Sequence, residues 1–306
     1  MDLVAQLNEI AVHFDNGMPL TVGNGGVVQP VTESVIPSHT GRGDQSEQRR
    51  QSEPSTRPWE ETSGWKGSSK SSPGASPGAF RATSSTTSLV NSLTDYISQT
   101  KSELEYAYPQ SHILTVDGGF WLIAESRLLI GVRPSALFAV AISEKMEKVK
   151  GWAFWHDPLI PTPNWIGPRH TNFKDGSICA FEPTDGTWIY GDPIVKLLDL
   201  YSSWAVRQLC LAYFGRWPGP QVGHYQGERL LETKEDELCP CGSMEKTYEQ
   251  CCAVPDRSRG AVSSVVNYLT QIDNPPRRAL PEVQNFVSSR SNPPDLEACL
   301  QARRLI

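Results

Sequence analysis

The chain has 306 residues, a formal net charge of −6 and seven cysteines, four of which lie between positions 239 and 252. An acidic chain without a long basic stretch does not favour a nucleic-acid scaffold, and the lack of an eighteen-residue apolar run argues against a membrane-spanning helix. Its start, Met1–Val4, lacks the positive region and apolar core of a signal peptide. Clustered cysteines are typical of metal ligands in a reducing compartment, so we expect a cytoplasmic protein.

The first 85 residues are rich in Ser, Gly, Thr and Pro, and no apolar periodicity is visible from about 21 to 85. Such a composition is typical of a linker that buries too little surface to order itself. Apolar residues recur at helical spacing over 3–14, which indicates either an amphipathic helix or a transient helix on a loose tail. The second interpretation is favoured, and we expect residues 1–85 to form a largely disordered arm.

The next segment predicts one helix followed by several strands. Ser88 is a candidate cap for a helix with apolar residues on one face, and Pro109 ends it. The dipeptide Asp117-Gly118 is a turn signal between two apolar runs. Short apolar or alternating runs predict an antiparallel meander, with strands at 112–116, 120–125, 128–132, 136–142 and 151–155.

A long irregular stretch and a long helix follow. Residues 156–192 contain five prolines, and long loops of this kind inside a compact region are usually functional. Asp192-Pro193 then predicts the start of a helix. Its apolar residues recur at a spacing of 3.6 residues from Ile194 to Ala212, and Gly215 ends it.

The irregular stretch carries a candidate nucleophile, Cys179. It follows the triplet His170-Thr171-Asn172 and the turn Asp175-Gly176. A thiol presented by a turn, with a side-chain amide nearby in sequence, suits thioester chemistry, because the thiolate attacks a carbonyl and a donor stabilises the oxyanion. The flanking Ile178 and Phe181 leave a second interpretation open, in which Cys179 is a small buried hydrophobic residue at the end of a strand.

The order of these elements over about 86–225 resembles the ubiquitin-conjugating enzyme fold. That family has a His-Pro-Asn triplet about ten residues before its active cysteine. Here His170-Thr171-Asn172 has Thr in place of Pro, and nine positions separate His170 from Cys179. Trp188 and the helix from Pro193 match the family's tryptophan loop and following helix. Trp204 together with Trp217-Pro218-Gly219 looks like the bacterial branch, which occurs beside activating-enzyme-like proteins or nucleotidyltransferases in antiphage operons.

The resemblance implies roles for individual residues. Cys179 would accept the C-terminal acyl group of a ubiquitin-like protein, or another activated acyl group, and pass it to an amine. Asn172 would donate a hydrogen bond to the oxyanion. His170 would hold the loop by a backbone hydrogen bond or polarise the thiol. Asp185, or alternatively Asp175, would orient or deprotonate an acceptor lysine.

The expected partners follow from the same resemblance. No Gly-x-Gly-x-x-Gly follows a predicted strand, so the chain would receive its acyl group from a separate activating enzyme. The partners would be that enzyme, a ubiquitin-like protein and a target such as a nucleotidyltransferase, with no nucleic acid and no membrane. Two other functions stay open. One is an inactive binding or adaptor protein, and the other is a cysteine hydrolase with His112 or His156 near the sulfur of Cys179.

The cysteine cluster is the strongest metal signal in the chain. Cys239, Cys241, Cys251 and Cys252 lie within fourteen residues, and four thiolates can close a tetrahedral zinc site. The pattern resembles the SEC-C motif, a small zinc-binding module found at the end of the SecA translocase and in many other bacterial proteins. Nine residues separate the cysteine pairs here instead of the family's eight. Since all four positions would be filled by protein, we expect structural Zn²⁺ in a docking module that folds with its metal.

The whole sequence therefore predicts an α+β protein. Its main domain would contain an N-terminal helix, a four-stranded antiparallel meander, an active-site loop and a long helix. The expected parts are a disordered arm at 1–85, the ubiquitin-conjugating-like domain at 86–228, the zinc module at 236–255 and a C-terminal tail with weak helices at 256–306.

Overall fold

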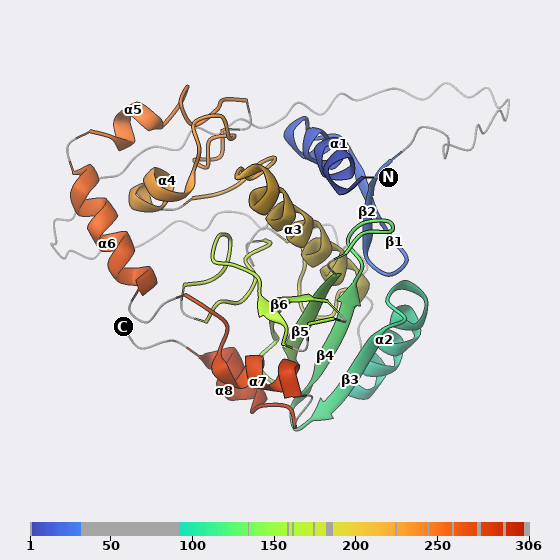
Figure 1. Cartoon of the computed structure of the whole chain (residues 1–306). Helices are drawn as coiled ribbons and strands as arrows, with labels where there is room; N and C mark the ends of the chain where they lie inside the picture. The colour runs from blue at the N-terminus through green and yellow to red at the C-terminus, as the bar shows by residue number, and fades with distance from the viewer. Residues whose placement is uncertain are drawn as a thin grey trace, which may run out of the picture. The chain divides into compact units, whose positions relative to one another are not determined.

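The computed structural model of this chain describes residues 2–31 and 92–302, with short gaps at 134, 158, 161, 174, 182–185, 224, 244, 259, 274–276 and 290–291. The described residues form a mixed α+β structure in which helices flank an antiparallel sheet (Figure 1). None of the described helices is both long enough and apolar enough to cross a bilayer.

The sheet has five strands in the spatial order β3-β4-β5-β6-β7, each antiparallel to the next. Val116 pairs with Gly119 across a two-residue turn at Asp117-Gly118, where Gly118 has the positive φ that such hairpins require. The predicted meander is therefore present, and one short strand extends it. The strands are β3 (Ser111–Val116), β4 (Gly119–Ser126), β5 (Ser135–Ser143), β6 (Lys148–His156) and β7 (Asn164–Trp165).

The prediction of a strand at 128–132 is wrong. Leu128 has a φ of 58°, which breaks an extended chain, and it makes only an isolated bridge with Val27. The amide of Val28 donates to the carbonyl of Leu128 at 2.8 Å. The side chains of Leu128 and Leu129 are buried in the core, so their apolar character serves packing in a connection and not strand pairing.

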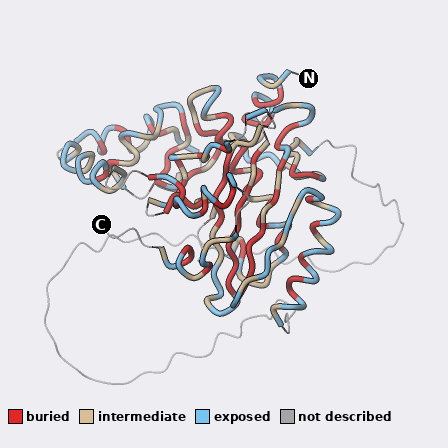
Figure 2. Tube along the Cα trace, turned by 60° about the horizontal axis from the view of Figure 1, so that its bottom comes forward, coloured by how far each residue is buried: buried red, intermediate tan, exposed pale blue. Residues whose placement is uncertain are grey.

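The central strands β4 and β5 are buried on both faces of the sheet (Figure 2). Successive side chains of a strand point to opposite sides, so each face needs its own cover. Phe120 and Leu122 of β4 face a core that includes α2 (Leu93–Ala107) and α3 (Ile194–Phe214). Trp121, between them, faces a second core on the opposite side. A sheet that is apolar on both sides needs an additional cover besides α2 and α3.

The N-terminal segment belongs to the first core, so the expected disordered arm is wrong for residues 2–31. Helix α1 (Leu3–Asp15) buries Leu7 and Ile10 and packs against α3. The hairpin of β1 (Leu20–Gly23) and β2 (Val27–Pro30) follows it. The apolar face of α1 is thus a packing surface of the domain. The remainder of the predicted arm and the predicted cap Ser88 lie outside the described residues, and the observed cap of α2 is Ser92.

The C-terminal segment covers the second face, and the helices predicted in the tail at 256–306 are present. Helices α7 (Pro281–Ser289) and α8 (Leu296–Gln301) bury apolar side chains against Trp121 and Trp152. The indole nitrogen of Trp121 donates to the carbonyl of Pro294 at 3.1 Å. These weak helical patterns are stabilised by the apolar sheet face that they cover.

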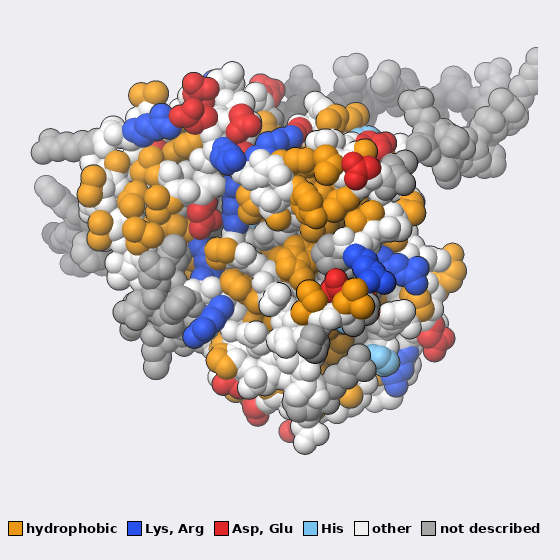
Figure 3. Space-filling model, viewed as in Figure 1, with side chains coloured by type: hydrophobic (Ala, Val, Ile, Leu, Met, Phe, Trp, Pro, Cys, Tyr) orange, Lys and Arg blue, Asp and Glu red, His pale blue; other side chains and the backbone are white. Residues whose placement is uncertain are grey.

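Helix α6 (Ala261–Asp273) differs from α7 and α8 because much of its apolar surface is exposed. Val262, Val266 and Leu269 lie at intervals of four and three residues and are exposed. In the space-filling view, hydrophobic side chains gather over this helix, at the left of the molecule (Figure 3). Its inner face carries Tyr268, which is buried against α4 (Gln226–Glu232).

A pair of substitutions in α1 tests whether this helix belongs to the core. Leu7→Ala removes a side chain with 0% exposure, and Val12→Ala removes one with 49% exposure from the same helix. We expect Leu7→Ala to lower the free energy of unfolding by about 2–5 kcal/mol, because it leaves a cavity. Val12→Ala should change it by less than about 0.5 kcal/mol. Urea unfolding measures both, and equal effects would mean that α1 does not pack on the domain.

Candidate functional site: a thiol cavity beside a four-cysteine cluster

The structure brings the predicted triplet and the predicted nucleophile together. The amide of Cys179 donates to the carbonyl of His170 at 3.0 Å, and Thr171 forms an antiparallel bridge with Ile178. The amide of Ile178 also donates to the carbonyl of Gly151 in β6 at 2.7 Å, so the loop is anchored to the sheet. The triplet and the nucleophile lie on the two arms of a small hairpin. His170 and Cys179, nine positions apart in sequence, are therefore direct neighbours in space.

The turn between them is held by Asp175. Its Oδ1 accepts from the amide and the hydroxyl of Ser177 at 2.9 and 2.6 Å, and its Oδ2 accepts from Lys150 at 2.5 Å. The carboxylate is buried. Gly176 has a φ of 66°, and a Cβ there would lie 2.3 Å from the backbone of Arg278. Asp175 therefore stabilises the turn and does not face an incoming amine, while Asp185 lies outside the described residues.

The thiol of Cys179 is half-buried and lines a cavity of about 370 Å³. The wall comes from four parts of the chain: the loop, α3, the segment after α3 and α4. Tyr201 of α3 is close enough for a thiolate at Cys179 to raise its pKa, in addition to the larger effect of burial. Besides the loop residues, the lining includes Leu200, Ser203, Trp204, Arg207, Trp217, Pro220, Gln221, Val222 and Glu228.

His170 holds the loop in place and is electrically neutral. Its ring packs on Trp217 with 4.1 Å between centroids, and its Nε2 lies 3.1 Å from Oε1 of Gln221. Burial, and then the charge of Arg169, lower the pKa of His170 to about 3. A neutral imidazole with this pKa is a weak base. The backbone carbonyl of His170 also accepts from the indole of Trp204 at 3.0 Å. The geometry of His170 therefore fits the loop-holding role better than acid–base chemistry.

Asn172 is exposed and lines the same cavity as Cys179. Its Nδ2 donates to the hydroxyl of Ser177 at 2.9 Å, and its backbone amide donates to the carbonyl of Ser177 at 2.8 Å. A primary amide carries two N–H donors, and the bond to Ser177 uses one of them. Asn172 therefore shares the cavity with Cys179, and Ser177 orients its side chain.

The two histidines that the hydrolase alternative could use lie elsewhere. His112 is on the edge strand β3 and lines a different cavity, between β3 and α2. The Nδ1 of His156 lies 3.3 Å from a carboxylate oxygen of Glu125. Neither residue lines the cavity of Cys179, so the expected Cys–His pair is not formed by these histidines.

A buried ion pair binds residues that line the cavity, and it was not predicted from the sequence. Both guanidinium nitrogens of Arg169 donate to the carboxylate of Glu237, which is fully buried. The carboxylate also accepts from the amide of Trp217 at 2.7 Å and from Nε2 of Gln221 at 3.0 Å. Gln221 in turn accepts from Arg169 and from His170. In the sequence Glu237 belongs to a charged run typical of an exposed connector, so no local signal marks it.

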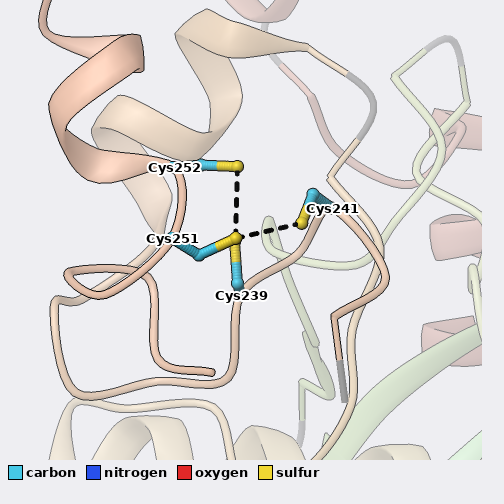
Figure 4. A group of neighbouring side chains, drawn as sticks. All are labelled: Cys239, Cys241, Cys251 and Cys252. Carbon is cyan, nitrogen blue, oxygen red and sulfur yellow. Dashed lines mark hydrogen bonds between the residues drawn. The ribbon is translucent and has the colours of Figure 1, made fainter. Parts of the chain in front are cut away.

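The four cysteines converge as expected (Figure 4). All four sulfurs lie within 4.8 Å of one another, with Cys241–Cys251 at 3.6 Å and Cys251–Cys252 at 3.8 Å. A tetrahedral site with zinc–sulfur bonds of about 2.3 Å places sulfurs about 3.8 Å apart. The amide of Cys239 donates to the carbonyl of Lys246 at 2.9 Å, which orients the first ligand. The cluster can hold a metal ion, and its spacing is compatible with zinc.

Polar contacts fasten the metal cluster to its surroundings. Asp256, at the end of α5 (Ala253–Asp256), accepts from Arg229 of α4 at 2.7 and 2.8 Å and from the hydroxyl of Tyr248 at 3.1 Å. Tyr248 and Asp256 are both buried. The residues predicted as a separate module at 236–255 are thus packed against neighbouring helices.

Substitutions of Glu237 and of its near neighbour Glu235 test how much the buried ion pair contributes to stability. Glu237→Gln leaves the guanidinium of Arg169 buried without a counter-charge, and breaking such a pair costs about 3–5 kcal/mol. Glu235→Gln removes an exposed ion pair with Arg257, and a solvent-screened pair of this kind should contribute little to stability. Chemical denaturation of the metal-loaded chain measures both losses. Equal stability of the two variants would contradict the structural role of Glu237.

Comparisons with known proteins add no family to this geometry. No protein-family model, no curated protein and no solved structure matches the chain. The function must therefore be inferred from the thiol cavity and the cysteine cluster themselves.

Proposed function

We propose that this chain is a ubiquitin-conjugating-like transferase that carries an acyl group as a thioester on Cys179. The observation that carries the proposal is the position of the thiol. It lines a cavity next to His170 and Asn172, on a loop tied to the sheet. A half-buried thiol at a cavity wall can be reached by a chain terminus and is partly shielded from water.

The proposed chemistry has two steps. In the first, the thiolate of Cys179 attacks the carbonyl of an acyl group carried as a thioester by a separate activating enzyme, and the thiolate of that enzyme leaves. In the second, an amine attacks the new thioester, Cys179 leaves as a thiolate, and the amine proton passes to solvent or to a base on the target. The second N–H of Asn172 would donate to the oxyanion in both steps, a contribution of about 3 kcal/mol in other enzymes. His170 would position the loop without transferring a proton.

The arrangement of elements also supports this proposal. A helix, an antiparallel meander, the thiol loop and a long helix follow one another as α2, β3 to β6, residues 166–181 and α3. A ubiquitin-like protein would supply the acyl group through its C-terminus. The target of transfer would be a lysine or a protein terminus, for example on a nucleotidyltransferase.

A catalytically inactive adaptor is the second candidate, and a specific observation favours it. The polar groups around the thiol are engaged in bonds that hold the loop: Asn172 binds Ser177, Asp175 binds Lys150 and His170 binds Gln221. An adaptor would use the same cavity to bind a partner's terminus without forming a covalent bond. The two candidates differ in whether an adduct appears.

Covalent loading of Cys179 distinguishes them. The chain is incubated with ATP, an activating enzyme and a ubiquitin-like protein from the same operon, and the products are separated without reductant. We expect an adduct that disappears on addition of thiol. Cys179→Ala should abolish it, and Cys179→Ser should replace it with an oxygen ester that resists thiol. The control is Cys210→Ala, which removes a buried cysteine of α3 that does not line the cavity.

Two outcomes would contradict the transferase. An adduct that persists in Cys179→Ala would place the chemistry on another residue. Absence of an adduct, together with binding of the ubiquitin-like protein to the unmodified chain, would establish the adaptor instead.

We further propose that the cysteine cluster binds one Zn²⁺ with a structural role, because four thiolates leave no coordination position for a substrate. Elemental analysis of the purified chain should give one zinc per chain. Cys241→Ser should lose the metal and lower the melting temperature, because metal binding contributes to folding. Cys179→Ala, which changes a cysteine outside the cluster, should keep one zinc. A full zinc content in Cys241→Ser would contradict the proposed ligand set.

A further inference from the structure

The wall of the thiol cavity and the metal cluster share one segment of backbone. Gln221 and Val222 line the cavity. Val222 forms an antiparallel bridge with the metal ligand Cys241, and the amide of Gly223 donates to the carbonyl of Pro240 at 2.9 Å. The stretch that lines this side of the cavity is therefore paired with the Cys239–Cys241 turn, which presents two of the four sulfurs.

A second link runs through the buried ion pair. Glu237 precedes the ligand Cys239 by two residues and binds Arg169, which adjoins His170 of the thiol loop. Gln221 connects both links, because it accepts from His170 at 3.1 Å and donates to the carbonyl of Leu238 at 3.3 Å. A displacement of residues 237–241 would thus be transmitted to the loop and to the wall together.

The cysteine cluster has only a small apolar core of its own beside its polar contacts. The local core consists of Cys239, Tyr248 and Ala253, with Cys251 and Cys252 partly buried against it. Such a small core does not order a loop unaided, and a bound metal supplies the missing free energy. A metal bound at the four cysteines would therefore stabilise the pairing of the cavity wall with Pro240 and Cys241.

We propose that metal bound at the four cysteines holds the wall of the thiol cavity in place, with Gln221 and Glu237 as the positioning residues that transmit its effect to the Cys179 loop. The inference rests on the proposed function in taking Cys179 as the reactive thiol. Loss of the metal would release the segment 221–223 and expose the sulfur, leaving the sheet and α3 intact. Metal occupancy would in this way regulate access to the thiol.

Site-resolved alkylation of the full chain tests this inference. The metal-loaded and chelator-treated proteins are exposed to iodoacetamide, and mass spectrometry follows the modification of Cys179 and Cys210. We expect removal of metal to accelerate the modification of Cys179 by about tenfold or more, because local opening exposes the sulfur. Cys210 is buried on α3, outside the cavity lining, and should stay unmodified in both samples.

A variant that keeps the metal tests the transmission itself. Gln221→Leu removes the side-chain bonds to the thiol loop, the buried ion pair and Leu238, but none of the proposed metal ligands. We expect it to raise the alkylation rate of Cys179 at unchanged metal content. Val254→Ser, on the exposed side of α5 next to the cluster, is the matched control and should leave the rate unchanged.

Two results would overturn the inference. Equal rates at Cys179 with and without metal would mean that the cavity is independent of the cluster. Parallel acceleration at Cys179 and Cys210 would mean that the metal supports the whole fold and not this wall. Neither measurement needs an acyl donor, so a chain with metal-dependent labelling but no thioester would retain the inference and lose the transferase.

Discussion

The buried pair of Arg169 and Glu237 is the interaction on which the arrangement of the site depends. It joins residues 68 positions apart, and its carboxylate also binds the backbone of Trp217. A buried ion pair of this kind adds little net stability, but leaving either partner unpaired is costly. The pair therefore selects one arrangement of the thiol loop, the cavity wall and the segment leading into the cysteine cluster.

The second constraint is a sheet that is apolar on both faces. Phe120 and Trp121 are adjacent in β4, yet each lies at the centre of a different core. Exposing either face to water would cost too much hydrophobic free energy. Both ends of the chain are recruited for this reason: α1 joins the first core and α7 and α8 cover the second. Segments with weak local patterns thus become part of one domain.

The titratable groups near the thiol of Cys179 are already engaged in other contacts. His170 is held neutral by burial, and Asp175 is used by Lys150 and Ser177, so neither acts as an acid or base in the proposed reaction. A transfer between thioesters needs little proton transfer in its first step, because a thiolate is both nucleophile and leaving group. In the proposed reaction the cavity would orient the carbonyl and Asn172 would supply the amide donor.

Local chemistry explains which features the sequence by itself determined. The hairpin at Asp117-Gly118, the long helix α3 and the cysteine cluster were predictable, because each depends on residues within about twenty positions of one another. The proximity of His170 and Cys179 followed from a nine-residue interval. Only the tertiary structure decided three other features: the packing of α1 in the core, the connection at Leu128 in place of a strand, and the pairing of Arg169 with Glu237. Each of them depends on surfaces supplied by distant parts of the chain.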